Sequence, residues 1–167
     1  NRGNIATPGA NVKADAPSCL VDAENRFEAR KIPGVKSTGV RLAFANWLTK
    51  PNSRAQALLA RVLVNRIWQH HFGRGIVASE NDFGVRGERP THPELLDWLA
   101  HQFVHEGWSI RQMHRLMMLS ATYQQSSVGD PRGHEVDPDA RLLWRFNPRR
   151  LSAEEIRDTM LQVSGEL

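Results

Sequence analysis

The residues with the most chemical capacity in this chain of 167 residues lie between positions 65 and 98. This polar block brings imidazoles, guanidinium groups, amides and carboxylates together with four glycines. Such side chains can bind, titrate or ligate a metal, and glycines let the backbone turn tightly around them. We therefore expect a site to form here, and its candidate binding residues are Arg66, His70, His71, Asp82 and His92.

The first alternative is whether Arg66 pairs internally or binds a ligand. Arg66 and His70 are four residues apart, so they share one face of a helix. Asp82 lies in a glycine-rich stretch that must fold back near the end of that helix. We favour a bidentate Arg66–Asp82 pair that anchors the loop. The alternative is a pocket in which Arg66, His70 and Asp82 bind an anionic or sugar ligand.

The histidines of the block carry a second alternative. Adjacent His70 and His71 point about 100° apart on a helix and do not easily face one ligand. Near a helix C-terminus the dipole favours a charged imidazole, and we interpret both as structural; a metal or haem ligand or a general base is the alternative. His92 is expected in the first turn of the next helix, where a neutral ring could ligate a metal with Asp82 and one of the other two imidazoles. No His-x-x-x-His spacing joins these residues, so we predict no metal site.

Two further groups of residues are interpreted as structural. Basic residues before position 151 and acidic residues after it nearly cancel, which favours ion pairs over a phosphate-binding patch. The candidate ion-pair residues are Arg149, Arg150, Glu154 and Asp158. The tryptophans and methionines at helical positions are interpreted as packing residues: Trp68, Trp98, Trp108, Trp144, Met113, Met117 and Met118.

The composition bounds the class of protein. Hydrophobic residues make up 40% and charged residues 24%, which is typical of a globular domain. The formal net charge is +4, and most of the basic residues are arginines suited to internal pairing, so we do not expect nucleic-acid binding. No apolar run approaches the ~20 residues of a membrane helix, and we predict no membrane span. Cys19 is the only cysteine, which excludes an internal disulfide and a haem-attachment motif, so no cofactor is expected in this chain.

Helix-start signals indicate the elements that must position these residues. A Ser or Thr followed three residues later by Glu or Gln can form a capping box. Four such pairs occur: Ser53–Gln56, Thr91–Glu94, Ser109–Gln112 and Ser152–Glu155. With apolar periodicity they predict helices from Ser53 to Phe72, from Thr91 to Gly107, from Ser109 to about Gln125 and onward from Ser152. Residues 41–48 and 137–144 are predicted as short helices, and residues 126–138 as a polar loop.

These elements predict an all-α fold, an irregular helical bundle with a long ordered Gly-rich loop at residues 73–90 and an extended N-terminal arm. Residues 1–38 are rich in Gly, Pro, Ala and Asn without periodicity, so they are expected to form the arm or a linker. Residues 39–167 are expected to form the helical domain. The chain starts at Asn1 and ends inside a periodic apolar pattern, and we expect a fragment of a longer protein.

Six stretches of the sequence resemble one family. They are VNRIWQHHFGRG (64–75), NDFGVRGE (81–88), THPELLDWL (91–99), SATY (120–123), LWR (143–145) and RRLSAE (149–154), with an opening Arg2-Gly3-Asn4. The chain resembles the planctomycete domain of unknown function called the PSD type, which is found in large exported bacterial proteins beside cytochrome-c-like modules. The resemblance extends over nearly the whole chain, and the family pattern continues beyond both ends.

The resemblance implies an extracytoplasmic setting, in the periplasm or at the cell surface, with any haem on a neighbouring domain. It predicts a non-catalytic accessory or docking domain of an exported multidomain, cytochrome-c-associated protein. The partners would be other domains of the same polypeptide or a redox partner. The alternative is a catalytic domain, a hydrolase or oxidoreductase acting on an extracellular polymer such as polysaccharide, with His70 or His92 as base and Asp82 as orienter or metal ligand.

Overall fold

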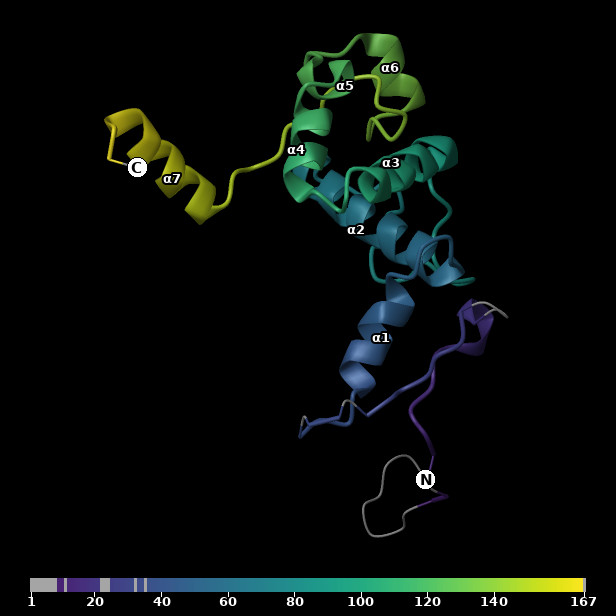
Figure 1. Cartoon of the computed structure of the whole chain (residues 1–167). Coiled ribbons are helices and arrows are strands. Elements are labelled where there is room, and N and C mark those ends of the chain that lie inside the picture. Colours follow the sequence, from purple (N-terminus) through teal and green to yellow (C-terminus); the bar gives the residue numbers. More distant parts are fainter. Residues whose placement is uncertain (1–8, 11, 22–24, 32, 35, 167) are drawn as a thin grey trace. The chain divides into compact units, whose positions relative to one another are not determined.

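The computed structural model describes residues 9–10, 12–21, 25–31, 33–34 and 36–166. Over these residues it contains seven α-helices, one 3-10 turn (Ser18–Leu20) and no β-strand, which confirms the all-α prediction (Figure 1). The chain divides into two compact units, Asn1–Ala60 and Arg61–Leu167. The opening Arg2-Gly3-Asn4 and part of the predicted arm lie outside the described residues. The N-terminal arm and the 39–167 domain therefore stay predictions.

In the first unit, α1 (Val40–Leu48) is held to the segment before it by a reciprocal pair of hydrogen bonds. Trp47 Nε1 donates to the Asn25 carbonyl oxygen at 3.0 Å, and Asn25 Nδ2 donates to the Trp47 carbonyl oxygen at 3.3 Å. Gly39, just before the helix, has φ 73°, and a Cβ there would lie 2.1 Å from the Arg30 carbonyl oxygen. The helix therefore begins at a position where only glycine fits.

The second helix, α2 (Arg54–Phe72), has the predicted start and end. Gln56 N donates to Ser53 Oγ at 3.1 Å, which satisfies one of the free N–H groups of the first turn. The Gln56 side chain accepts from Asn52 N at 3.0 Å, one residue before the position that a capping box uses. Gly73, with φ 79°, ends the helix in the left-handed conformation that favours glycine.

The third helix, α3 (Pro93–His105), starts differently from the prediction. His92 is the N-cap residue, and no side chain caps this end. The Thr91 hydroxyl donates to the Ile76 carbonyl oxygen at 3.4 Å. The predicted capping box at Thr91 is therefore wrong, because the hydroxyl contacts the preceding loop. A proline in the first turn needs no N–H partner, which partly offsets the missing cap.

The helix predicted from Ser109 to about Gln125 is two helices, α4 (Ile110–Met118) and α5 (Ala121–Gln124). The chain turns at Ser120. Its hydroxyl donates to the Met117 carbonyl oxygen at 2.6 Å and accepts from Tyr123 N at 3.2 Å. Ser120 therefore closes one helix and caps the next, a dual hydrogen-bonding role that apolar periodicity does not reveal.

The helix α6 (Pro131–Val136) lies within the segment that was predicted as a loop. Asp130 caps it, because its Oδ1 accepts from Gly133 N at 2.7 Å. The next residue is proline, which is favoured in a first helical turn. An aspartate followed by proline thus starts a helix here, as the prediction assumed for the similar pair at residues 137–138.

The short helix predicted over residues 137–144 is wrong. The Asp137 carboxylate accepts from Arg141 N at 3.0 Å and from Leu142 N at 2.8 Å, and its carbonyl oxygen accepts from Trp144 Nε1 at 2.8 Å. Ala140 has φ 47°, which a helix does not permit. Asp137 therefore organises a series of turns, because its carboxylate bonds to residues four and five positions later.

The last helix, α7 (Ala153–Ser164), begins with the predicted capping box. Glu155 N donates to Ser152 Oγ at 3.2 Å, and Ser152 N donates to the Glu155 carboxylate at 2.7 Å. Both bonds satisfy backbone groups that a helix start would leave free. Gly165, with φ 77°, ends the helix.

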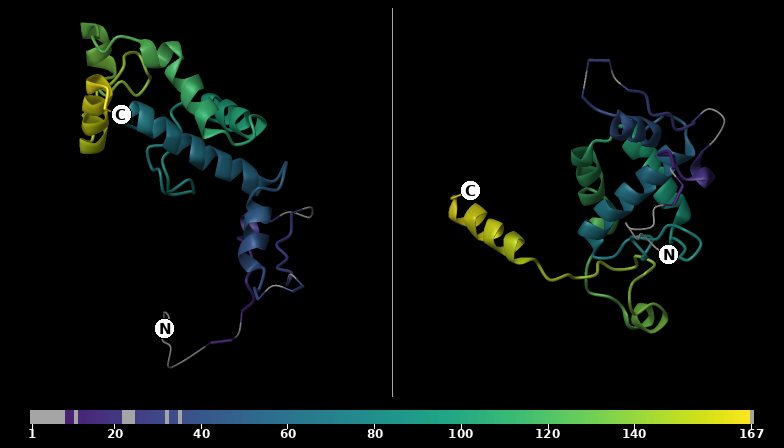
Figure 2. Two further views of the ribbon diagram at one scale, coloured as in Figure 1. Left: turned by 60° about the vertical axis from the view of Figure 1, so that its left-hand side comes forward. Right: turned by 90° about the horizontal axis from the view of Figure 1, so that it is seen from below.

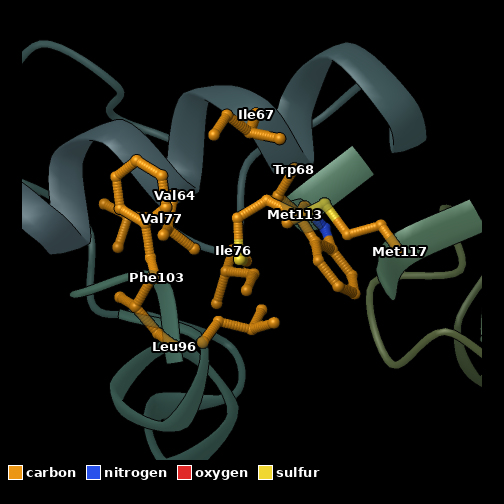
Figure 3. Close-up of a cluster of buried hydrophobic side chains, with 10 residues drawn as sticks. Val64, Ile67, Trp68, Ile76, Val77, Leu96, Phe103, Met113 and Met117 are labelled. Carbon is orange, nitrogen blue, oxygen red and sulfur yellow. The ribbon is translucent and has the colours of Figure 1, made fainter. Parts of the chain in front are cut away.

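The core of the second unit forms where α2, α3 and α4 lie together with the loop that follows α2 (Figures 1 and 2). Figure 3 shows side chains from all four segments converging on one cluster. Its buried members are Val64, Ile67, Trp68, Ile76, Val77, Leu96, Leu99, Phe103, Met113 and Met117. Ile76 and Val77 come from the loop, so burying them ties the loop to the helices.

Candidate functional site

Asn65 is the polar residue that holds the loop after α2. Its side chain is 0% exposed. Nδ2 donates to the Val77 carbonyl oxygen at 2.9 Å, and Oδ1 accepts from Val77 N at 2.8 Å. One amide thus replaces both partners that a neighbouring strand would offer to Val77. Gly75 must lie against this amide, because a Cβ there would be 2.6 Å from Asn65 Nδ2.

Arg66 contacts the loop through a different residue from the one predicted. Its Nη2 donates to Asn81 Oδ1 at 3.3 Å. Asp82 Oδ1 accepts from Gly84 N at 2.8 Å, a turn within the loop. The structure therefore does not form the expected Arg66–Asp82 pair. Asp82 bonds within its own turn, and its neighbour Asn81 takes the position opposite Arg66.

Glu88 links the loop to the segment at residues 139–147. Its carboxylate lies 3.7 Å from Arg74 Nη2 and 3.3 Å from Arg141 Nη2. All three side chains are about half exposed, so each pair contributes only about 0–1 kcal/mol. Glu88 N also donates to Ser79 Oγ at 2.8 Å, which fixes the backbone that carries the carboxylate.

His71 forms a pair with a histidine that sequence reasoning did not select. His71 Nε2 and His114 Nδ1 are 2.7 Å apart. The Tyr123 ring stands perpendicular to His71, with ring centroids 5.7 Å apart. One imidazole must donate and the other must accept, so this histidine pair requires at least one neutral ring. His70, the neighbouring residue, is exposed on α2.

The environment of His71 opposes a positive charge. Burial is the main cause that lowers the pKa of His71, and the positive groups of His114, Arg149 and His70 lower it further. The expectation that the helix dipole favours a charged ring here is wrong. Desolvation and like charges outweigh the attraction of the helix C-terminus.

We expect the free energy of unfolding to fall as the pH falls below 6.5, the value of an unperturbed histidine. Because the pKa of folded His71 is lowered, the unfolded chain binds a proton at a pH where folded His71 does not. The free energy of unfolding therefore falls as the pH falls from 6.5 toward the lowered pKa. Urea unfolding at about pH 7.5 and about pH 5.5 measures the change. His71→Gln should reduce the pH dependence, whereas His70→Gln should leave most of it, because His70 is the weakest of the causes that lower the pKa of His71. Identical dependence in both variants would contradict this assignment.

His92 lies at the N-terminus of α3, with Nδ1 3.0 Å from Thr91 Oγ1. It lines a small cavity of about 50 Å³, whose wall also contains Arg74, Arg141 and Arg145. Among the residues that the structure describes, no three His, Cys, Asp or Glu side chains are placed to hold a metal ion. The five candidate binding residues thus have separate surroundings: Asn81 for Arg66, solvent for His70, His114 for His71, Gly84 for Asp82 and Thr91 for His92.

Four residues are expected from the sequence to form ion pairs: Arg149, Arg150, Glu154 and Asp158. Arg149 makes a bidentate pair with Glu155, with Nη1 3.0 Å from Oε2. This pair and the hydrogen bond from Ser152 N lower the pKa of Glu155 to about 2. Asp158 lies 3.3 Å from its neighbour Arg157. The other two have no ion-pair partner in the described part of the chain.

An apolar groove of about 500 Å³ is lined mainly by α3 and α4. Its buried side chains include Trp68, Met113 and Met117, which confirms their predicted packing role. Trp98 and Leu119 also line it, and they are 52% and 63% exposed. The packing interpretation is therefore wrong for Trp98, which presents half of its surface to solvent, and for Met118, which is 46% exposed.

The candidate residues did not include several that form these sites, among them Asn65, His114, Arg141 and Arg145. Tyr123 and Arg145 lie in the short SATY and LWR stretches, so the resemblance did contain a signal for them. His114 directly follows the buried Met113, at the edge of the apolar face of α4. Its partner is 43 residues away in the chain, and no local pattern identifies such a contact.

None of the helices in the described part of the chain is both long and apolar enough to cross a membrane. No curated protein and no solved structure matches the chain. A family described as "PSD1: Protein of unknown function (DUF1553)" matches residues 40–167. That range contains every candidate site residue and begins at the first residue of α1. The chain therefore belongs to the PSD1 family of proteins of unknown function.

Proposed function

We propose that this chain is a non-catalytic docking domain of an exported multidomain protein that also carries cytochrome-c-like modules. Membership of the PSD1 family and the resemblance of its motifs to the PSD type support this setting. In this proposal the chain works outside the cytoplasm, and haem belongs to a neighbouring module of the same polypeptide. The apolar groove lined by α3 and α4 is the observation that carries the docking role.

The groove has the surface chemistry of a protein-binding site. Trp98, on α3, and Leu119, directly after α4, both expose large apolar areas in this groove. Contiguous apolar patches of this kind mark interaction surfaces. Tryptophan is among the residues that contribute most to binding energy when a partner covers them. Met113 and Met117 lie beneath, and flexible thioether side chains adapt to a partner's shape.

The occupant that fits this groove is an amphipathic helix of the haem-bearing module. An apolar groove between two helices can bind a third helix, whose apolar side chains at spacings of three and four residues fill the groove. Arg115 and Glu106 line the same groove. The occupant should therefore carry an acidic residue opposite Arg115 and a basic residue opposite Glu106.

Leu119→Asp should weaken binding of this chain to the haem module of its own polypeptide by about tenfold or more, because it places a charge in the apolar contact. Isothermal titration calorimetry between the two purified proteins measures the affinity. Leu142→Asp is the matched control, since Leu142 is also 63% exposed and does not line the groove. That control should bind within about twofold of the unmodified chain.

Absence of binding between the unmodified chain and the haem module would overturn the proposal. Equal weakening by Leu119→Asp and Leu142→Asp would show that the groove is not the contact surface. Circular dichroism of both variants establishes that each remains folded, so that a loss of affinity reports on the surface.

A further inference from the structure

The structure contains a second, smaller cavity with a strongly basic wall. None of the solvent-exposed residues that line the apolar groove also line this cavity. Its volume is about 50 Å³, and its wall joins the loop after α2 to the segment at residues 139–147. The residues that line it include three arginines, Arg74, Arg141 and Arg145, and one aspartate, Asp139. The wall therefore carries an excess of positive charge, only part of which Glu88 offsets from outside the lining.

Arg145 is held in place by its neighbours. Its guanidinium carbon lies 5.3 Å from the centroid of the Trp144 ring, a cation–π contact. Its Nη2 donates to the Pro138 carbonyl oxygen at 3.1 Å. A Cβ on Gly129 would come within 3.1 Å of Arg145 Cδ, so the chain also confines the stem of this side chain. The position of the charge is thus fixed before any ligand arrives.

One hydrogen-bond donor in this fixed group has no partner. Arg145 Nε is the single buried side-chain nitrogen or oxygen without a hydrogen bond among the residues described. A buried donor on a charged group is costly to leave unsatisfied, by roughly 1–3 kcal/mol or more. An anionic acceptor bound beside Arg145 would neutralise the excess charge, and one that reaches Nε would also remove this penalty.

Other polar groups of the wall have their own partners. Asn147 Nδ2 donates to the Asp139 carbonyl oxygen at 2.6 Å, and His92 Nδ1 lies 3.0 Å from Thr91 Oγ1. These contacts orient the wall without using Arg145 Nε. The cavity volume suits a group of a few atoms such as a carboxylate or phosphate.

We propose that the cavity lined by Arg74, Arg141 and Arg145 binds a small oxyanion group, which accepts a hydrogen bond from Arg145 Nε. Of the residues that line this cavity only the buried Trp68 also lines the docking groove, and none of the variants proposed for either site changes it, so either proposal can fail without the other. Arginine suits this chemistry because its planar fork of donors matches the oxygens of carboxylates and phosphates. Glu88, bridging Arg74 and Arg141 through long contacts, is the internal carboxylate with which the ligand competes.

Titration of the full chain with phosphate, sulfate and acetate, each at constant ionic strength set by sodium chloride, tests the proposal. Nuclear magnetic resonance of the arginine Nε–H groups reports on Arg145 directly. We expect a saturable shift of that signal, and comparing the three anions distinguishes a phosphate or sulfate ligand from a carboxylate one. A shift that rises linearly without saturation for all three anions would overturn the proposal and leave a water molecule as the acceptor.

Two variants and one control separate this site from general charge effects. Arg145→Lys keeps the charge but removes the Nε donor, and it should weaken oxyanion binding at least about fivefold. Arg74→Gln changes a half-exposed side chain of the same wall, so it should fold normally and bind severalfold more weakly. Arg89→Gln, which removes the charge of an exposed arginine outside the cavity lining, should bind like the unmodified chain. Unchanged affinity in Arg74→Gln would contradict the proposal even if Arg145→Lys did not fold.

Discussion

Asn65→Ala should lower the free energy of unfolding by about 3 kcal/mol, because it leaves the N–H and carbonyl groups of Val77 buried without partners. Both residues are almost fully buried, so water does not readily replace the lost amide. Equilibrium unfolding in urea measures the total effect. Hydrogen exchange at the Val77 amide measures the local effect, and we expect its protection to fall in parallel.

Asn81→Ala is the matched control for this prediction. The Asn81 amide is exposed and contacts Arg66 Nη2 at 3.3 Å. Its loss should change the free energy of unfolding by no more than about 0.5 kcal/mol. If Asn65→Ala proved as mild as this control, the paired hydrogen bonds to Val77 would not be what holds the loop.

Gly87→Ala should destabilise the protein by about 2–3 kcal/mol, because the loop cannot accept a methyl group at this position. A Cβ there would lie 2.0 Å from the Asp82 carbonyl oxygen and 2.9 Å from Ser79 Oγ. Backbone atoms cannot move aside as a flexible side chain can, so the turn must open. Trypsin cleavage after the exposed Arg86 should accelerate along with the loss measured in urea.

Gly84→Ala in the same loop provides the comparison. The nearest atom to a Cβ there is Asp82 Oδ1 at 3.1 Å, the end of a side chain that can shift by a few tenths of an ångström. The expected loss is about 1 kcal/mol or less. Equal destabilisation by the two substitutions would show that the carbonyl of Asp82 does not limit the loop, and that general glycine flexibility does.

The helices that are predicted correctly begin or end at sequence signals that act over only a few residues. α1 and α2 occupy the expected residues, and α7 forms its complete capping box. A cap depends on a side chain and a backbone N–H three residues apart, so a short window of sequence contains all of its atoms. Gly73 ends α2 for an equally local reason, since its φ of 79° suits glycine alone.

The errors concern residues whose side chains have a choice of partners. Thr91 could have capped α3, yet its hydroxyl contacts the carbonyl oxygen of Ile76, fifteen positions earlier. Asp137 could have started a helix, yet its carboxylate accepts from Arg141 N and Leu142 N. Such polar side chains offer the backbone alternatives to a helix, and packing of distant segments selects among them.

The sequence by itself determined the all-α class, the bounds of α1 and α2, the starts of α4 and α7, and the polar block around residues 65–98. These depend on periodicity, caps and glycine conformations, which act within a few residues. Only the tertiary structure decided which side chains meet: Asn65 with Val77, His71 with His114, and three arginines around one cavity. Such contacts join residues 12 to 71 positions apart, and the folding of the core, not any local preference, brings them together.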